Sequence, residues 1–343
     1  MERRSSPESG ELLFGIIKRV VISVSHLSKY YQVHQKEPGF IGSLKSLFAR
    51  RYEVVKAVDD ISFDISEGEL IGFIGPNGAG KTTTLKCLSG LLYPTSGRIS
   101  VLGFTPFQRK KEFLKQIAFV MGQKNQLWWD LPAMDTFALN KEIYEVPQKQ
   151  FDEVLFELTR LLDVSDLLKV AVRKLSLGQR MKMELIAALI HFPKVLFLDE
   201  PTIGLDVVLQ QKLREFIKEY NKRYKATIIL TSHYMGDVEA LCKRVIIINN
   251  GRILYDGQLL ELVKKHAPYK SITVVFREYV DPKKLAGFGV IQKFDYPKLE
   301  LQVSSSQVGK VTAKILEQFE VEDLTIEEPE IEDVIREVFL KKE

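Results

Sequence analysis

The stretch GPNGAGKT, residues 75–82, decides the fold of this chain. It fits the phosphate-loop pattern G-x-x-x-x-G-K-[ST], and it lies between the apolar run ELIGFIG (69–75) and the helical pattern KTTTLKCLSGLL (81–92). Glycines let the backbone wrap closely enough to aim N–H groups at phosphate oxygens, and the following helix adds its positive end. Lys81 is predicted to reach the β- and γ-phosphates, and the Thr82 hydroxyl to bind Mg²⁺. A chance match in a Gly/Pro turn is the competing interpretation, and the flanking strand and helix argue against it.

A second stretch, VLFLDE at 195–200, is a short apolar run that ends in two acids. Such a run is typical of a buried parallel strand, and open α/β sheets place their ligands at the carboxyl ends of their strands. Asp199 is predicted to hold Mg²⁺ and Glu200 to act as general base toward an attacking water. Alone, the pair is as often a helix cap or a turn. Behind a phosphate loop it favours nucleotide chemistry.

The stretch LSLGQRMKMELIAALI begins at Leu175 and places Ser176 three residues before Gln179. This spacing is a capping box on the helix that follows, which is the favoured interpretation of the stretch taken alone. A capped helix start is also a site for anions, because its N–H groups and its positive dipole end face outward.

Strand-like and helix-like segments alternate beyond the phosphate loop. LQQKLREFIKEYNKRY (209–224) is an amphipathic helix, ATIILTSH (226–233) a buried strand, and VIIINNGRILYDG (245–257) a hairpin with Asn250-Gly251 at its turn. This alternation predicts an α/β fold with a mostly parallel, doubly wound sheet.

Bulk composition limits the classes of protein that the chain can be. A length of 343 residues suggests about two domains, and 45% apolar with 27% charged residues is ordinary for a globular protein. A net charge of +4 is too small to imply nucleic-acid binding, and none is expected. Cys87 and Cys242 have no metal spacing and are expected to be reduced core thiols. The longest apolar run, 12–24, is interrupted by Lys18 and Arg19, so neither a membrane span nor a signal peptide is expected.

Together these stretches resemble the ATP-binding-cassette (ABC) ATPases. LSLGQ at 175–179 matches the family signature L-S-G-G-Q except that Leu177 replaces the first glycine, which restricts φ and adds bulk. It stands just upstream of the strand FLDEP (197–201), in the family's order, and GLD at 204–206 is similar to the D-loop.

Three further residues extend the resemblance over roughly residues 20–265. His233 is similar to the family's switch histidine and Gln123 to its Q-loop glutamine. Tyr31, in LSKYY, is similar to the aromatic that stacks on adenine, with Tyr30 as the alternative.

The resemblance implies a phosphate-loop cassette over 19–266, with a mostly parallel central sheet, an antiparallel β subdomain and a helical subdomain at about 123–180. A basic amphipathic helix is expected as an insertion at about 38–51, and residues 1–18 are expected to form an N-terminal tail. The pattern after residue 267 changes to strands followed by helices, which predicts a small α+β accessory domain at 267–343.

The resemblance also implies a head-to-tail pair of cassettes, here a homodimer, with two ATP molecules sandwiched between them. Glu200, His233 and Gln123 would be catalytic, and Thr82, Gln123 and Asp199 would bind Mg²⁺. Ser176 and Gly178 would close over the ATP of the other subunit. The nucleotide-binding set implied is Tyr31, Gly75, Asn77, Gly78, Gly80, Lys81, Thr82, Thr83, Ser176, Gly178, Gln179 and Asp206.

The branch of the family is indicated by the run at 75–97 and by the ending IEDVIREVF (331–339), which look like the exporters of drugs, lipids or polysaccharides. Separate transmembrane permease subunits are implied, with this chain at the cytoplasmic side of the inner membrane. An importer ATPase and a soluble, non-transport ABC ATPase are the alternatives.

Trp128 and Trp129, the only tryptophans, stand side by side in GQKNQLWWDLP (122–132). Adjacent side chains point in different directions, so both cannot easily enter one core. Either one ring packs inward and the other is incidental, or at least one is exposed and anchors a short helix of the membrane partner.

Overall fold

The computed structural model describes residues 19–34, 52–122 and 126–340. The predicted N-terminal tail (1–18), the basic insertion (38–51) and Gln123 lie outside these described residues. Within the described ranges no helix has the length and apolar character needed to cross a membrane.

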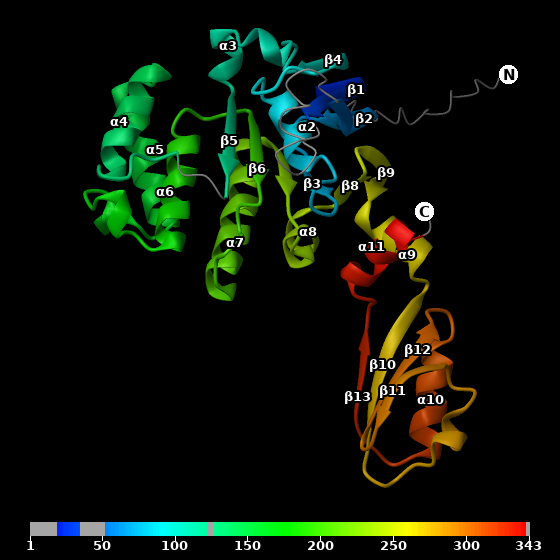
Figure 1. The fold of residues 1–343 in the computed structure, drawn as a ribbon. Coiled ribbons are helices and arrows are strands. Elements are labelled where there is room, and N and C mark those ends of the chain that lie inside the picture. Colours follow the sequence, from blue (N-terminus) through cyan, green and yellow to red (C-terminus); the bar gives the residue numbers. More distant parts are fainter. Residues whose placement is uncertain (1–18, 35–51, 123–125, 341–343) are drawn as a thin grey trace, which may run out of the picture.

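The central element is a six-stranded sheet in the order β5-β6-β7-β3-β8-β9 (Figure 1). All neighbouring pairs are parallel except β8 and β9, which form an antiparallel hairpin. Its turn residues, Asn250 and Gly251, have φ values of 46° and 75°, as the predicted Asn-Gly turn requires. The strands are β3 (Leu70–Ile74), β5 (Ile117–Met121), β6 (Val195–Asp199), β7 (Thr227–Thr231), β8 (Arg244–Asn249) and β9 (Arg252–Gln258).

A second, antiparallel sheet has the order β2-β1-β4. Its strands are β1 (Val20–His34), β2 (Tyr52–Ser66) and β4 (Ser96–Val101). The alternation of buried and exposed residues along β2 places one face on a shared core with α2 (Lys81–Leu88), the helix that follows the phosphate loop. This packing fixes the loop between two sheets.

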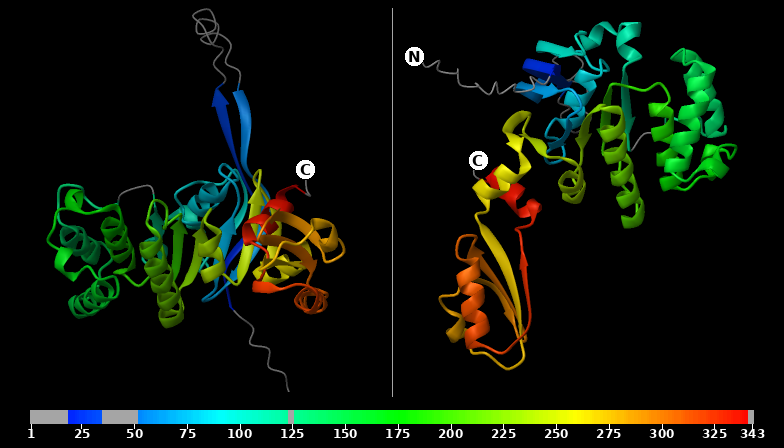
Figure 2. Two further views of the ribbon diagram at one scale, coloured as in Figure 1. Left: turned by 90° about the horizontal axis from the view of Figure 1, so that it is seen from below. Right: turned by 180° about the vertical axis from the view of Figure 1, so that it is seen from behind.

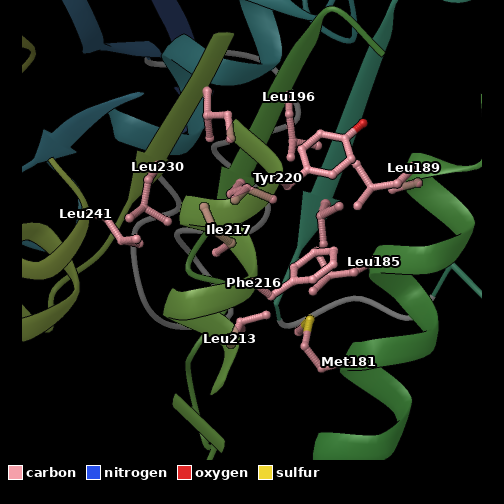
Figure 3. Close-up of a cluster of buried hydrophobic side chains, with 14 of the residues drawn as sticks. Met181, Leu185, Leu189, Leu196, Leu213, Phe216, Ile217, Tyr220, Leu230 and Leu241 are labelled. Carbon is pink, nitrogen blue, oxygen red and sulfur yellow. The ribbon is translucent and has the colours of Figure 1, made fainter. Parts of the chain in front are cut away.

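Helices fill the region between β5 and β6 in the sequence and form a lobe beside the central sheet (Figure 1). They are α4 (Ala133–Ile143), α5 (Gln148–Leu161) and α6 (Leu177–Leu189). Helix α6 continues to Leu189, beyond the predicted end of the helical subdomain near 180, because its apolar face packs against α7 (Val207–Tyr224). Figure 3 shows Met181 and Leu185 of α6 facing Leu213 and Phe216 of α7.

The shorter helices complete the cassette. They are α3 (Lys111–Leu114), α8 (Met235–Leu241), α9 (Leu259–His266) and the 3-10 turns η1 (Pro106–Gln108), η2 (Ser165–Leu167) and η3 (Val172–Lys174).

After α9 the chain forms an antiparallel sheet in the order β11-β12-β10-β13, with α10 packed on one face. Figure 2 shows this unit projecting from the cassette. The order of strands is that of a ferredoxin-like fold whose first helix is reduced to the turn η4. The elements are β10 (Tyr269–Phe276), η4 (Pro282–Leu285), β11 (Val290–Asp295), β12 (Lys298–Ser304), α10 (Val308–Gln318) and β13 (Val321–Glu327).

The last helix, α11 (Ile331–Leu340), packs away from this small sheet. Its buried residues Val334, Ile335 and Val338 belong to the core cluster of the cassette, which includes α8 and α9. The prediction assigned all of 267–343 to the accessory domain. Because an amphipathic helix follows the partner that covers its apolar stripe, α11 packs with the cassette instead.

Candidate nucleotide-binding site

The phosphate loop approaches other backbone segments so closely that side chains are excluded. A Cβ atom on Gly75 would lie 2.1 Å from the carbonyl oxygen of Ile248, and one on Gly80 would lie 2.3 Å from that of Ala57. Gly80 also has a φ of 107°, in the left-handed region that favours glycine. These two glycines are therefore required by packing as well as by the approach of a phosphate.

Lys81 stands at the start of α2 and is 6% exposed. Its Nζ donates to the carbonyl oxygens of Gly75 (2.7 Å) and Pro76 (3.0 Å). Burial lowers the pKa of this ammonium, and the nearby carboxylates of Glu200 and Asp199 oppose that shift. The loop thus holds a positive charge at the place where phosphate would lie.

The side chains of Thr82 and Asp199 meet across the gap between α2 and β6. The Thr82 hydroxyl donates to Asp199 at 2.8 Å (Oδ2) and 3.1 Å (Oδ1), and the Thr231 hydroxyl donates to Oδ1 at 2.6 Å. Hydroxyl and carboxylate oxygens are ligands that suit Mg²⁺. Over 19–34, 52–122 and 126–340 no group of three or more His, Cys, Asp or Glu side chains is arranged to hold a metal ion.

Thr231 was not predicted as a site residue. It lies in register with Asp199 on the neighbouring strand, as a polar residue at the end of an otherwise apolar run. That position, in ILTSH, was the signal that could have identified it.

Glu200 has a left-handed backbone with φ of 53°, which costs free energy in a residue other than glycine. Its N–H donates to the carbonyl oxygen and to the hydroxyl of Thr231, both at 3.1 Å. Its Oε1 lies 3.3 Å from Nδ1 of His233. The carboxylate and the imidazole thus face each other at the edge where β6 and β7 end.

The signature segment forms the capping box that the spacing predicts. The Ser176 N–H donates to Oε1 of Gln179 (2.9 Å), and the Gln179 N–H donates to Oγ of Ser176 (3.2 Å). Leu177 is the first residue of α6 and has no positive φ, so the restriction expected from replacing glycine does not arise there. The leucine still adds bulk at this position. Its Cδ2 lies so close to Gly204 that a Cβ atom on Gly204 would be only 3.0 Å away.

Two more predicted residues lie close to this segment. A Cβ on Gly178 would lie 2.3 Å from Leu209 Cδ1, so the start of α6 is packed against the start of α7. Asp206 is the N-cap of α7, and its carboxylate accepts from the N–H of Leu209 (2.9 Å). The signature and D-loop residues therefore form a second group, built on the starts of two neighbouring helices.

The two tyrosines of LSKYY have different surroundings. The Tyr30 hydroxyl donates to Asp59 (2.5 Å), which also binds Arg252 (2.8 and 3.0 Å), and these bonds lower the pKa of Asp59 to about 2. Tyr31 remains half-buried, and Lys29 lies 5.1 Å from the centre of its ring. The ring of Tyr30 is thus held by hydrogen bonding, whereas the Tyr31 ring has the ammonium of Lys29 over one face.

The other predicted nucleotide-binding residues lie on or beside the loop. Asn77 and Gly78 are exposed at its tip, and Thr83 is half-buried in the first turn of α2. The structure thus brings Lys81, Thr82, Asp199, Glu200 and His233 to one edge of the sheet.

Comparison with known proteins identifies the same architecture. The family described as "ABC transporter" matches residues 58–203, and the family described as "EvrA-like ABC transporter, C-terminal domain" matches residues 268–327. A solved chain titled "Structure of ATP binding subunit of ABC transporter" superposes with a TM-score of 0.60 at 25% identity, over 71% of this chain and 92% of that one. A dimeric ATP-binding cassette bound to ADP and Pi superposes with a TM-score of 0.57 at 21% identity, over 69% and 98%.

Three curated relatives are similar in sequence. The ABC transporter ATP-binding protein NatA of Bacillus subtilis is 36% identical over 63% of this chain and 87% of its own length. The bacitracin transport ATP-binding protein BcrA of Bacillus licheniformis is 34% identical over 64% and 71%. The methionine import ATP-binding protein MetN of Geobacillus kaustophilus is 33% identical over 67% and 68%. The phosphate loop, the fold and these relatives together show that the chain belongs to the ABC transporter family, as an ATP-hydrolysing, ATP-binding subunit.

Proposed function

We propose that this subunit hydrolyses Mg²⁺-bound ATP as a homodimer and thereby drives export through separate transmembrane permease subunits. The observation that carries the catalytic part is the meeting of Lys81, Thr82, Asp199, Glu200 and His233 where β3, β6 and β7 end. Parallel α/β sheets bind ligands at that edge.

Each of these side chains has a role that its chemistry suits. Lys81 neutralises charge on the β- and γ-phosphates, and Glu200 takes a proton from the attacking water. His233 holds Glu200 and the γ-phosphate in relation to each other. Tyr31 stacks on the adenine.

The phosphate contacts come from backbone and hydroxyl donors. They are supplied by Gly75, Asn77, Gly78, Gly80, Thr82 and Thr83.

Thr82, Asp199 and Gln123 would hold Mg²⁺. When bound, the ion would neutralise developing charge on the phosphate oxygens. The Thr82 hydroxyl already lies 2.8 Å from the Asp199 carboxylate, which supports a cation shared by these two side chains.

The second group of residues is assigned to the partner's nucleotide. Ser176 and Gly178, at the start of α6, supply a hydroxyl and a backbone N–H to the γ-phosphate of the facing subunit, because a helix start binds anions. Gln179 fixes Ser176 through the capping box, and Asp206 fixes the start of α7 beside it.

The direction of transport is proposed as export, from the resemblance of the run at 75–97 and of the ending at 331–339 to the exporter branch. Similarity to MetN makes import the competing direction. Once the permease is isolated with this subunit, ATP-driven accumulation of substrate in inside-out vesicles would support export, and release from them would contradict it.

The accessory unit is proposed to span about 268–328. The core of the small sheet is separate from the core that α11 joins, and the matching C-terminal family covers nearly the same residues.

Substitution at Glu200 tests the catalytic proposal. In Glu200→Gln, ATP binding is expected to remain while turnover falls by roughly 10² to 10⁴, the usual contribution of a general base. Lys81→Ala is expected to weaken nucleotide binding itself. Glu219→Gln, an exposed carboxylate on α7, is the matched control and should leave both quantities unchanged. Wild-type turnover in Glu200→Gln would show that another group activates the water.

A further inference from the structure

A carboxylate with no solvent exposure lies directly behind the catalytic edge. Asp237, in the first turn of α8, is 0% exposed. Its Oδ2 accepts from the hydroxyls of Thr202 (2.5 Å) and Ser232 (2.8 Å), and its Oδ1 accepts from Nε of Arg214 (2.6 Å). Neither the nucleotide chemistry nor the dimer contacts proposed above use this residue.

The three donors come from the segments that position the reacting groups. Thr202 follows Glu200 by two residues on the loop after β6, and Ser232 directly precedes His233 after β7. The Ser232 hydroxyl also accepts from the N–H of Tyr234 (3.0 Å), so the backbone is fixed on both sides of His233. One carboxylate therefore joins the loop that carries the general base to the loop that carries the histidine.

Arg214 adds a third connection, to α7. The N-cap of this helix is Asp206, in the D-loop segment whose Gly204 lies close to Leu177. The Arg214 guanidinium packs beside Gly236 of α8, where a Cβ atom would lie 3.4 Å from Nη2, an ordinary van der Waals distance. The ion pair thus links the catalytic loops to the helix that starts in the D-loop.

Asp237 and its three donors form a junction between three segments, and the cost of burying an unpaired charge makes this junction rigid. A buried carboxylate is tolerated only when it is paired and hydrogen-bonded. Asp237 meets that condition with one guanidinium and two hydroxyls, so a shift of any of the three segments leaves a buried charge undersatisfied. Charge-assisted bonds of this kind are also stronger than neutral ones.

We propose that Asp237 is a positioning residue that holds Glu200 and His233 in register with each other and with α7. The proposal rests on the catalytic roles given above to Glu200 and His233. A misplacement of about 1 Å in a catalytic group can cost on the order of 10²-fold in rate. Loss of the junction is therefore expected to lower kcat without removing nucleotide binding.

The first test is Asp237→Asn in the full chain, because the amide keeps the shape and loses the charge that pairs with Arg214. We expect kcat to fall at least ~10-fold, with KM for ATP and nucleotide affinity within about two-fold of wild type. Asp237→Glu, which restores the charge, should recover part of the loss. Glu239→Gln, on the exposed face of the same helix, is the control and should not change kcat.

The second test separates positioning from general destabilisation. Because Asp237 acts through both Glu200 and His233, adding Asp237→Asn to a variant that carries Glu200→Gln and His233→Ala should lower kcat no further, since both positioned groups are already absent. A further ten-fold fall in this triple variant would overturn the proposal. So would a kcat in Asp237→Asn equal to wild type while Glu200→Gln is inactive.

Two milder variants keep the proposal testable if Asp237→Asn fails to fold. Thr202→Val and Ser232→Ala each remove one hydroxyl and leave the Arg214 ion pair in place. Each should lower kcat several-fold at unchanged KM, and each should add nothing to the variant that carries Glu200→Gln and His233→Ala. Unchanged kcat in both folded variants would refute the positioning role of Asp237. If Glu200→Gln itself is fully active, the catalytic proposal fails instead.

Discussion

At the scale of single residues, the adjacent Trp128 and Trp129 differ in their contacts. Trp128 is 51% exposed and Trp129 is 47% exposed, so neither is a core residue. The Trp129 ring lies 5.1 Å from the guanidinium of Arg180 on α6, whereas no ring or cation contact of Trp128 occurs among the described residues. The segment is held from behind by Glu184, whose buried carboxylate accepts from the N–H groups of Gln126 (2.7 Å) and Leu127 (3.1 Å).

This difference predicts unequal effects of the two substitutions. Trp128→Ala should leave stability and basal ATPase activity unchanged and weaken assembly with the permease by about 2 kcal/mol or more, as truncation of an interface anchor does. Trp129→Ala should also lower the melting temperature slightly, because it removes the contact with Arg180. Thermal melts and basal ATPase of the free subunit, beside co-purification with the permease, measure these effects. Normal assembly of both variants would exclude the tryptophans from the interface.

Residues that belong to a motif or whose partners are near in sequence could be predicted, and residues outside any motif whose partners are distant could not. The capping box of Ser176 and Gln179 spans three positions and was predicted from spacing. The donors to Asp237 lie 5, 23 and 35 positions away, so only the folded chain brings them together. The buried thiols Cys87 and Cys242 were expected from composition, and burial raises the pKa of the former to about 11.

At the scale of elements, strands β3, β6 and β7 and the Asn-Gly hairpin follow directly from their apolar runs and turn residues, whereas β5 was not predicted. The end of the helical lobe and the place of α11 do not follow in this way. The two features depend on which neighbouring element covers the apolar face of a helix. The apolar pattern of the helix alone does not identify that element. The sequence therefore predicts helix α11 as the end of the accessory domain, although its residues Val334 and Ile335 are buried in the cassette core.

This packing gives two deletions opposite outcomes. Removing 268–343 takes away α11 and exposes the surfaces of α8 and α9 that it covers, each buried Val or Ile being worth about 1.5–3 kcal/mol. Residues 271 and 327 are paired neighbours on β10 and β13, so a short Gly/Ser linker can replace 272–326 and keep α11.

We expect the full truncation to lower the melting temperature strongly or to precipitate. The linker variant should retain nucleotide binding and fold stably. Calorimetric melting and nucleotide affinity of both proteins provide the measurement. Equal stability of the two variants would mean that α11 contributes nothing to the cassette.

At the scale of the whole molecule, the site residues fall into two groups that lie on different elements. Lys81, Asp199, Glu200 and His233 gather where the sheet ends, whereas Ser176, Gly178 and Asp206 occupy the starts of α6 and α7. The resemblance to the ABC ATPases implies dimers in which such groups face each other across the subunit interface. For this chain the proposed partner is a second copy.

Mixed dimers test that proposal directly. Lys81→Ala removes the phosphate-loop cation, and Ser176→Arg blocks the segment that would face the partner's ATP, so each homodimer should be inactive at both of its sites. In a heterodimer, one composite site contains both lesions and the other contains neither. Mixing the two inactive proteins should therefore restore part of the wild-type ATPase activity. Each heterodimer has one intact site of two, so it can reach up to half the activity of a wild-type dimer. ATPase assays over a titration of the mixing ratio, with heterodimers verified by two affinity tags, give the measurement. Activity that never exceeds that of the single variants, despite proven heterodimers, would place Ser176 in the same subunit as the ATP it contacts.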